Sequence, residues 1–156
     1  MFLEDDRSNY GSKSLFSMKM EEILPETLRG VYITLSSPTE VLSVAAVEGD
    51  LEPAEVAIAY DADVNAVHPV FELPIIHVVA GHGFRNIAEA ILKTERCDLT
   101  VRDRLGRLAS DCAALCAHDY ELADRLAEVQ AAQFRSSGKD PRRATMPNYG
   151  SFRYEP

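Results

Sequence analysis

A pattern that recurs about every 34 residues constrains the fold of this chain more than any other feature. It begins at Leu42, appears a second time up to Gly106, and continues as a weaker third copy from Ser110. Three pairs of equivalent residues define the period: Gly49 with Gly83, Ala80 with Ala114, and Asp63 with Asp98. This spacing is typical of a solenoid, in which each repeat is one pair of helices.

Each copy also places small residues and a turn at matching positions. In the first copy these are Ala45, Ala46 and Gly49, followed by the turn Asp61-Ala62-Asp63-Val64-Asn65. This pattern resembles that of the ankyrin repeat family. The resemblance implies an all-α solenoid of helix–turn–helix repeats, in which small residues allow close helix packing and short hairpin loops, called fingers, project from one side.

The second copy departs from the family pattern in two places. It has Glu95-Arg96-Cys97 where the family usually has Gly-Ala, and one extra residue lies between Asn65 and Gly83. Either Pro74 or His77 can match a family position, and we prefer His77 because that register also places Ala80 and Gly83. We expect His77 to form a hydrogen bond with the backbone of a neighbouring loop.

The chain is expected to contain four parts. Residues 1–17 read as a mobile arm and 18–36 as N-terminal capping helices. The repeats occupy 37–134 and begin at the helix cap Ser37-Pro38-Thr39-Glu40. Residues 135–156 form a basic, aromatic tail.

Charge and cysteine content limit the possible partners and compartment. The net charge of −9 argues against nucleic-acid binding, because phosphates must be met by Lys and Arg. No segment is apolar over the length of about 20 residues that a membrane span needs, and no secretion signal is evident. Three cysteines without such a signal favour reduced thiols and a cytoplasmic location, or a host cytosol for a delivered effector. The oligomeric state stays open.

The sequence lacks the common motifs of nucleophilic or phosphate chemistry, so we expect no enzyme, no cofactor and no metal. A zinc site from Cys97, Cys112, Cys116 and His118 is the alternative we weigh against simple packing. We favour packing because no CxxC pair is present. The competing functional hypothesis is a small metal- or thiol-dependent enzyme that uses His77, His82, Cys97, Cys112 and Cys116.

The expected function is binding of a protein partner through a concave surface of fingers and inner helices. The first finger is unusually apolar for a projecting loop, and the second is basic. The expected contact residues are Val67, His68, Val70, Phe71, Arg102, Arg104 and Arg107. In the alternative interpretation, Phe71 folds under its loop as a local core residue and the arginines are merely solvated.

The tail offers a second candidate motif. Tyr149, Phe152 and Tyr154 are dense for a solvated segment, so they would dock on the protein itself or bind a partner. Arg142-Arg143-Ala144-Thr145 is similar to a basophilic kinase site, and phosphorylation of Thr145 would reduce the positive charge. Short, divergent arrays of this kind resemble those of bacterial host-directed effectors and toxin-neutralising proteins.

Overall fold

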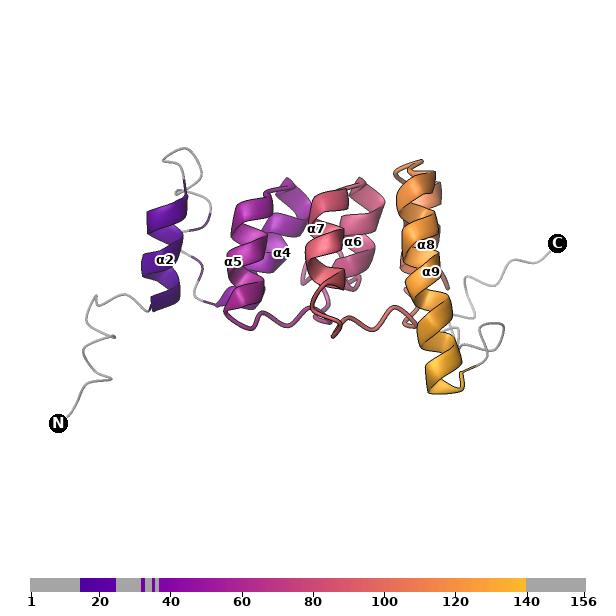
Figure 1. Ribbon diagram of the computed structural model, residues 1–156. Helices are drawn as coiled ribbons and strands as arrows, with labels where there is room; N and C mark the ends of the chain where they lie inside the picture. The colour runs from indigo at the N-terminus through magenta and orange to yellow at the C-terminus, as the bar shows by residue number, and fades with distance from the viewer. Residues whose placement is uncertain (1–14, 25–31, 33–34, 36, 140–156) are drawn as a thin grey trace. The chain divides into compact units, whose positions relative to one another are not determined.

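The computed structural model describes residues 15–24, 32, 35 and 37–139, and these residues form helices and loops (Figure 1). The described part of the chain contains no strand, only an isolated antiparallel bridge between Val67 and Pro74. The all-α class is therefore confirmed. The chain divides into two compact units, residues 1–63 and 64–156.

The first unit contains three described helices: α2 (Leu15–Ile23), α4 (Pro38–Glu48) and α5 (Leu51–Ala59). Ser37 caps α4 as expected, since its side chain accepts a hydrogen bond from Glu40 N at 3.2 Å. Gly49 ends α4 in the left-handed conformation, with φ 81°. Helices α4 and α5 then pack as a pair through small residues with no exposed surface: Ala45, Ala46, Ala54 and Ala57.

Helix α2 packs beside α5 in the same unit. It begins at Leu15, ahead of the boundary at Met18 that we expected from the sequence, because Phe16 is buried and its ring lies 5.4 Å from that of Tyr60. Tyr32 is buried, and its hydroxyl donates to Asp50 at 2.8 Å. The bond joins Tyr32 to the residue that directly precedes α5.

The second unit contains four helices in two pairs: α6 (Ile75–His82) with α7 (Arg85–Leu92), and α8 (Ala109–Leu115) with α9 (Tyr120–Ser137). Its core is aliphatic and fully buried at Ile75, Val79, Ile87, Ile91, Leu99 and Leu126. Ala80 and Ala113 are also fully buried where α6 contacts α8, whereas Ala114 is partly exposed. The expectation of small residues at helix contacts is thus met at Ala80 and Ala113 but not at Ala114.

Two helices of the second unit end or begin at well-defined caps. Gly83 ends α6 with φ 74°, and the Asp119 side chain caps α9 by accepting from Leu122 N at 3.0 Å. Helix α9 continues to Ser137, beyond the expected end of the repeats at Phe134. Left-handed residues recur 34 positions apart in three pairs: Gly49 and Gly83, Asp61 and Glu95, Glu72 and Gly106.

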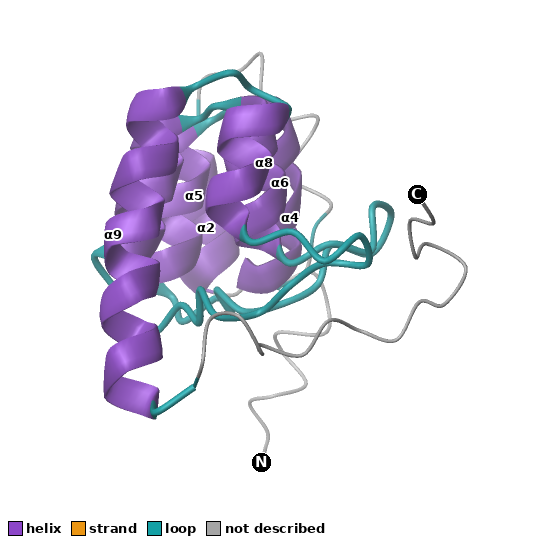
Figure 2. Ribbon diagram, turned by 90° about the vertical axis from the view of Figure 1, so that its right-hand side faces the viewer, coloured by secondary structure: helices purple, strands orange, loops and turns teal. Residues whose placement is uncertain are grey.

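Long loops precede α6 and α8. Figure 2 shows these loops extending from the side on which α6 and α8 lie, away from α9. At the base of the loops, side-chain amides join successive turns. Asn65 bonds to Arg96 O and Asp98 N at 2.9 and 2.8 Å, and Gln133 bonds to Cys97 O and Leu99 N at 2.8 and 2.7 Å.

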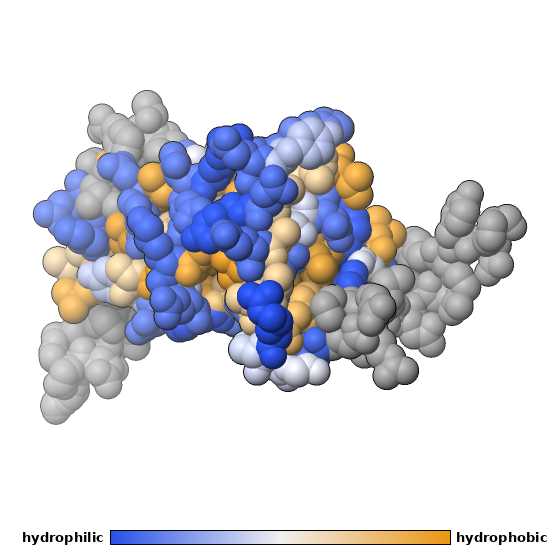
Figure 3. All heavy atoms as spheres, turned by 45° about the vertical axis from the view of Figure 1, so that its right-hand side comes forward, coloured by the Kyte–Doolittle hydropathy of each residue, from blue (hydrophilic) through white to orange (hydrophobic). Residues whose placement is uncertain are grey.

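Ion pairs connect α7 with α9 on the opposite side. Arg85 pairs with Asp119 at 2.7 Å and also with Glu121, and Arg125 pairs with Glu89 at 2.8 Å. The Arg85 guanidinium lowers the pKa of Asp119 by its hydrogen bonds. Hydrophilic residues cover much of the surface in Figure 3. Within the described residues, no helix is both long enough and apolar enough to cross a membrane.

Candidate binding site

The loop of residues 65–74, which we call the first finger, is fixed by its own backbone. His68 N donates to Leu73 O at 2.7 Å, and Glu72 N donates back to His68 O at 2.7 Å. Ile75 N closes the base by donating to Ala66 O at 3.0 Å. Glu72 adopts φ 57°, which reverses the chain at the tip. The first finger is therefore a tight hairpin-like loop.

His68 organises this loop from the inside. Its Nδ1 accepts hydrogen bonds from Val70 N at 3.1 Å and Phe71 N at 3.3 Å, and its ring lies 4.9 Å from that of Phe71. The residue is only 6% exposed. We expected His68 on the contact surface, and that expectation is wrong, because its ring is used to hold the backbone of the loop.

The apolar residues around His68 face outward. Val67 is 58% exposed, Val70 77% and Phe71 47%. The alternative in which Phe71 becomes a buried core residue of the loop does not match this exposure. Since the loop is internally bonded, these side chains are presented by a fixed backbone and not by a flexible one.

The loop of residues 100–108, which we call the second finger, is built around Asp103. Its side chain has no exposed surface, and it accepts from Leu105 N, Arg107 N and Arg107 Nε at 2.9, 2.8 and 2.7 Å. Gly106, with φ 80°, completes the turn by donating to Asp103 O. Sequence reasoning did not single out Asp103. The available signal was an Asp at the first position and a Gly at the last position of a four-residue segment, a common β-turn arrangement.

The three arginines of the second finger have different environments. Arg104 is exposed and forms an ion pair with Glu72 of the first finger, so the two fingers lie side by side as expected. Arg102 donates from Nη1 to Gly106 O at 2.7 Å. Arg107 is 25% exposed at its side chain and is held by Asp103. Each of the three arginines therefore already forms a hydrogen bond or an ion pair within or between the fingers.

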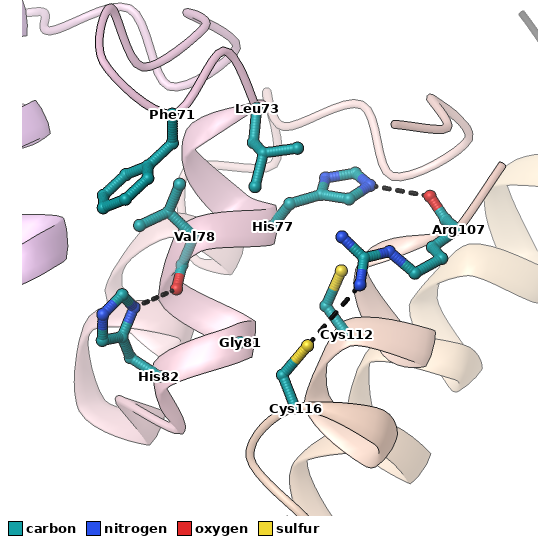
Figure 4. Close-up of a pocket in the computed structure, with 9 residues that line it drawn as sticks. All are labelled: Phe71, Leu73, His77, Val78, Gly81, His82, Arg107, Cys112 and Cys116. Carbon is teal, nitrogen blue, oxygen red and sulfur yellow. Dashed lines mark hydrogen bonds between the residues drawn. The ribbon is translucent and has the colours of Figure 1, made fainter. Parts of the chain in front are cut away.

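A cavity of about 180 Å³ lies where the fingers meet the inner helices α6 and α8 (Figure 4). Its walls are mostly apolar and its polar groups are two imidazoles, two thiols and one guanidinium. The lining residues are Phe71, Leu73, His77, Val78, Gly81, His82, Arg107, Cys112 and Cys116. Of the expected contact residues, Phe71 and Arg107 line this cavity.

The two histidines of α6 serve local bonds. His77 Nε2 donates to Arg107 O at 3.0 Å, which confirms the expected bond to a neighbouring loop. Burial lowers the pKa of His77, and its Nδ1 is buried with no hydrogen-bond partner among the described residues. His82 Nδ1 donates to Val78 O at 2.8 Å, and its ring stacks on Phe84.

One group of side chains has the types of atom that bind metals. His77, Asp103 and Cys112 offer ligand atoms within 4.8 Å of one another, whereas Cys97 and His118 are not part of this group. However, both Asp103 oxygens already accept hydrogen bonds, and the Arg107 guanidinium occupies the position beside Oδ2. A cation would have to displace that guanidinium, so the geometry favours a packed hydrogen-bond network over a metal centre.

The cysteines are free thiols of two kinds. Cys97 and Cys112 are buried, and burial raises the pKa of each to about 12. Such thiols remain protonated near neutral pH and are poor nucleophiles. Cys116 is exposed and accepts from Arg107 Nη1 at 3.6 Å. Cys97 and Cys112 therefore act as small apolar residues, as the packing interpretation expected, whereas the exposed Cys116 does not.

The tail candidates Tyr149, Phe152 and Tyr154, and the site Thr145, lie outside the described residues. The last described residue is Lys139, whose Nζ donates to Thr100 Oγ1 at 3.0 Å. The comparisons with known proteins give no relative: no family model matches the chain, and no curated protein is similar to it.

Proposed function

We propose that this chain is a protein-binding module built from short ankyrin-like repeats, and that it binds a protein partner through its fingers and inner helices. The observation that carries the proposal is a rigid finger that displays apolar side chains. Val67, Val70 and Phe71 are exposed on a loop whose backbone is bonded to His68. Folding alone gives no reason for that exposure, whereas binding does.

The repeat assignment is supported by spacing in both the backbone and the hydrogen bonds. Left-handed residues recur one repeat period apart. Within the second unit, bonds between the helix pairs also join residues one period apart: Arg85 with Asp119, Asn65 with Asp98, and Leu99 with Gln133 are separated by 34, 33 and 34 positions. In a solenoid, each repeat contacts its neighbour through equivalent positions, which produces this kind of spacing.

Rigidity is the physical reason that such a surface would bind well. Ordering a mobile loop on association costs free energy, and the first finger is already ordered by its own hydrogen bonds. Binding energy would then come from a few apolar anchors beside Arg104 and Arg107. The resemblance to short bacterial effectors or toxin-neutralising proteins is in keeping with a protein partner, and the three free thiols suit a reducing cytoplasm.

The alternative of a metal- or thiol-dependent enzyme has less support. Four of its five proposed groups, His77, His82, Cys112 and Cys116, line the same cavity. However, both histidines donate to backbone carbonyls, and burial raises the pKa of the Cys97 and Cys112 thiols. A catalytic nucleophile needs the opposite, a lowered pKa beside a base.

Site-specific photocrosslinking tests the proposal. A benzophenone amino acid replaces Val70 on the first finger in one variant and Tyr120 at the start of α9 in another, since both positions are exposed. Each variant is incubated with lysate of the source cells, and crosslinked proteins are identified by mass spectrometry. We expect one protein to be captured from position 70 and not from position 120.

The captured protein is then purified, and its affinity is measured for the parent chain and for Phe71→Ala and Arg104→Glu, after circular dichroism shows that both variants are folded. Substitution of a residue that anchors the partner should weaken binding by about 2 kcal/mol. Equal capture from both positions, or equal affinity of the folded variants, would refute binding through the fingers.

A further inference from the structure

The cavity between the fingers and the inner helices has one cation pointed into it. Arg107 is oriented by two groups at once: its Nε donates to Asp103 Oδ2 at 2.7 Å, and its backbone carbonyl accepts from His77. Figure 4 shows the guanidinium directed toward the sulfur atoms of α8. The Nε edge of Arg107 is thereby occupied, and the side chain has little freedom to turn away.

The other edge of the guanidinium is poorly used. Among the described residues, only the Cys116 sulfur accepts from its Nη atoms, at 3.6 Å. A thiol sulfur is a weak acceptor, whereas a carboxylate can accept two parallel bonds from the edge of a guanidinium. Arg107 therefore has capacity for an acidic group that the protein itself does not fill.

The walls around this guanidinium are apolar. Phe71 and Leu73 form one side, Val78 and Gly81 another. A cavity of about 150 Å³ is enough to hold benzene, and this one measures about 180 Å³. It can thus receive one aromatic or branched aliphatic side chain, with the guanidinium at its wall.

We propose that this cavity recognises an acidic–apolar peptide segment of the partner, in which one Leu- or Phe-like side chain enters the cavity and a neighbouring Asp or Glu pairs with Arg107. The inference rests on the proposed function and adds the chemistry of the partner to it. An internal acidic side chain fits better than a chain terminus, because Arg104 on the same finger offers a second cationic contact, shared with the exposed Glu72.

Gly81 provides a means to close the cavity without disturbing the fingers. A Cβ at Gly81 would have ordinary contact, 3.7 Å, with the Cβ of Cys116, so Gly81→Ala should fold at least as well as the parent. Gly81→Leu places its larger side chain in the cavity. Gly83 is the contrasting position, because its φ of +74° and a contact of 3.3 Å with Ala117 make any side chain strained there.

The probe is a display library of random dodecapeptides that is selected on the intact chain. The peptides are fused at their C-termini, so that none has a free C-terminal carboxylate. Enriched peptides are synthesised with a C-terminal amide, together with matched versions that carry Asn or Gln in place of Asp or Glu. Their affinities are measured by fluorescence anisotropy for the parent, Gly81→Ala, Gly81→Leu and Arg107→Gln. Arg125→Gln, which changes a charge between α7 and α9, is the control.

We expect the library to enrich sequences with an acidic residue close to Leu or Phe. Gly81→Leu should weaken binding at least about 10-fold, which corresponds to about 1.4 kcal/mol. Arg107→Gln should weaken binding of the acidic peptide similarly, and should weaken binding of the version with Asn or Gln much less. Arg125→Gln should leave both affinities unchanged. Because Gly81→Leu leaves Arg107 in place, it tests the role of the cavity even if Arg107→Gln does not fold.

Three outcomes would overturn this inference. One is enrichment of peptides without acidic residues. Another is a peptide affinity that stays the same in the Gly81 and the Arg107 variants. The third is no enrichment from this library combined with binding of peptides that have a free C-terminus. In each case, capture of a partner from position 70 would still support the proposed function, so the two failures are distinguishable.

Discussion

The two fingers have similar turns, but different kinds of side chain hold their backbones from the inside. Each has a left-handed residue at its turn, Glu72 in the first and Gly106 in the second, 34 positions apart. The first finger is held by the imidazole of His68 and displays apolar side chains. The second is held by the carboxylate of Asp103 and displays the guanidinium of Arg104 beside the exposed apolar residues Val101 and Leu105.

This difference shows how one backbone turn can carry two kinds of surface. A neutral imidazole accepts backbone N–H groups without attracting cations, so its finger is free to display apolar residues. A buried carboxylate needs a positive partner, and Arg107 supplies it. The cavity is lined by Phe71 of the first finger and Arg107 of the second.

The largest expected effect is the loss of the carboxylate inside the second finger. Asp103→Ala removes the acceptor of Leu105 N, Arg107 N and Arg107 Nε, and should lower the free energy of unfolding by about 3 kcal/mol. Urea unfolding measures this loss. Asp103→Asn keeps an oxygen for the backbone donors and should lose about half as much; equal losses would mean that the backbone bonds contribute little.

The corresponding change in the first finger should be smaller. His68→Ala leaves two backbone donors, Val70 N and Phe71 N, without their acceptor at a partly solvated site, with an expected loss of about 2 kcal/mol. Hydrogen exchange of these two amides should accelerate while the amides of Leu105 and Arg107 keep their protection. If both fingers lose protection together, they are not independent structures. His68→Asn, with an oxygen near the position of Nδ1, is the matched control.

The stability of the protein should depend on pH through His77 of α6. Burial lowers the pKa of His77 in the folded protein, so as pH falls below its unfolded value of about 6.5, the unfolded chain takes up the proton first. His77 therefore lowers the free energy of unfolding by at most about 1.4 kcal/mol per pH unit, until it is protonated in the folded protein too. Above about pH 6.5 it has no such effect.

The measurement compares urea unfolding of the parent and His77→Gln at pH 7.5 and pH 5.5. Glutamine can still donate to Arg107 O but does not titrate, so the variant should lose less stability between the two values. The same pH dependence in both proteins would contradict a lowered pKa at His77. Other titrating groups act equally on both chains and cancel in the difference.

The smallest effect concerns the ion pair that joins the two fingers. Glu72 and Arg104 are both more than half exposed, and such pairs contribute roughly 0 to 1 kcal/mol. The charge-reversed double variant Glu72→Arg with Arg104→Glu should restore most of what either single change loses in a double-mutant cycle. A coupling near zero would mean that the fingers are held side by side by the helices alone.

The sequence predicted the features that depend on local chemistry. Ser37 was assigned as a helix cap because capping needs a specific side chain at a fixed position, and the structure confirms that cap. The close packing of Ala46 and Ala80 was expected from the 34-residue spacing and is confirmed, whereas Ala114, at the third equivalent position, is partly exposed. The His77 bond was predicted as well, since a polar residue in a buried helix must find a partner.

Only the tertiary structure decided the interiors of the fingers and the shape of the cavity. In the sequence, His68 and Asp103 are ordinary polar residues of loops, and both become buried because the backbone curls around them and aims its N–H groups at their acceptor atoms. The cavity needs Phe71, Gly81, Arg107 and Cys116 from four separate segments to converge. A linear pattern records spacing along the chain, whereas such convergence depends on packing between residues that are distant in sequence.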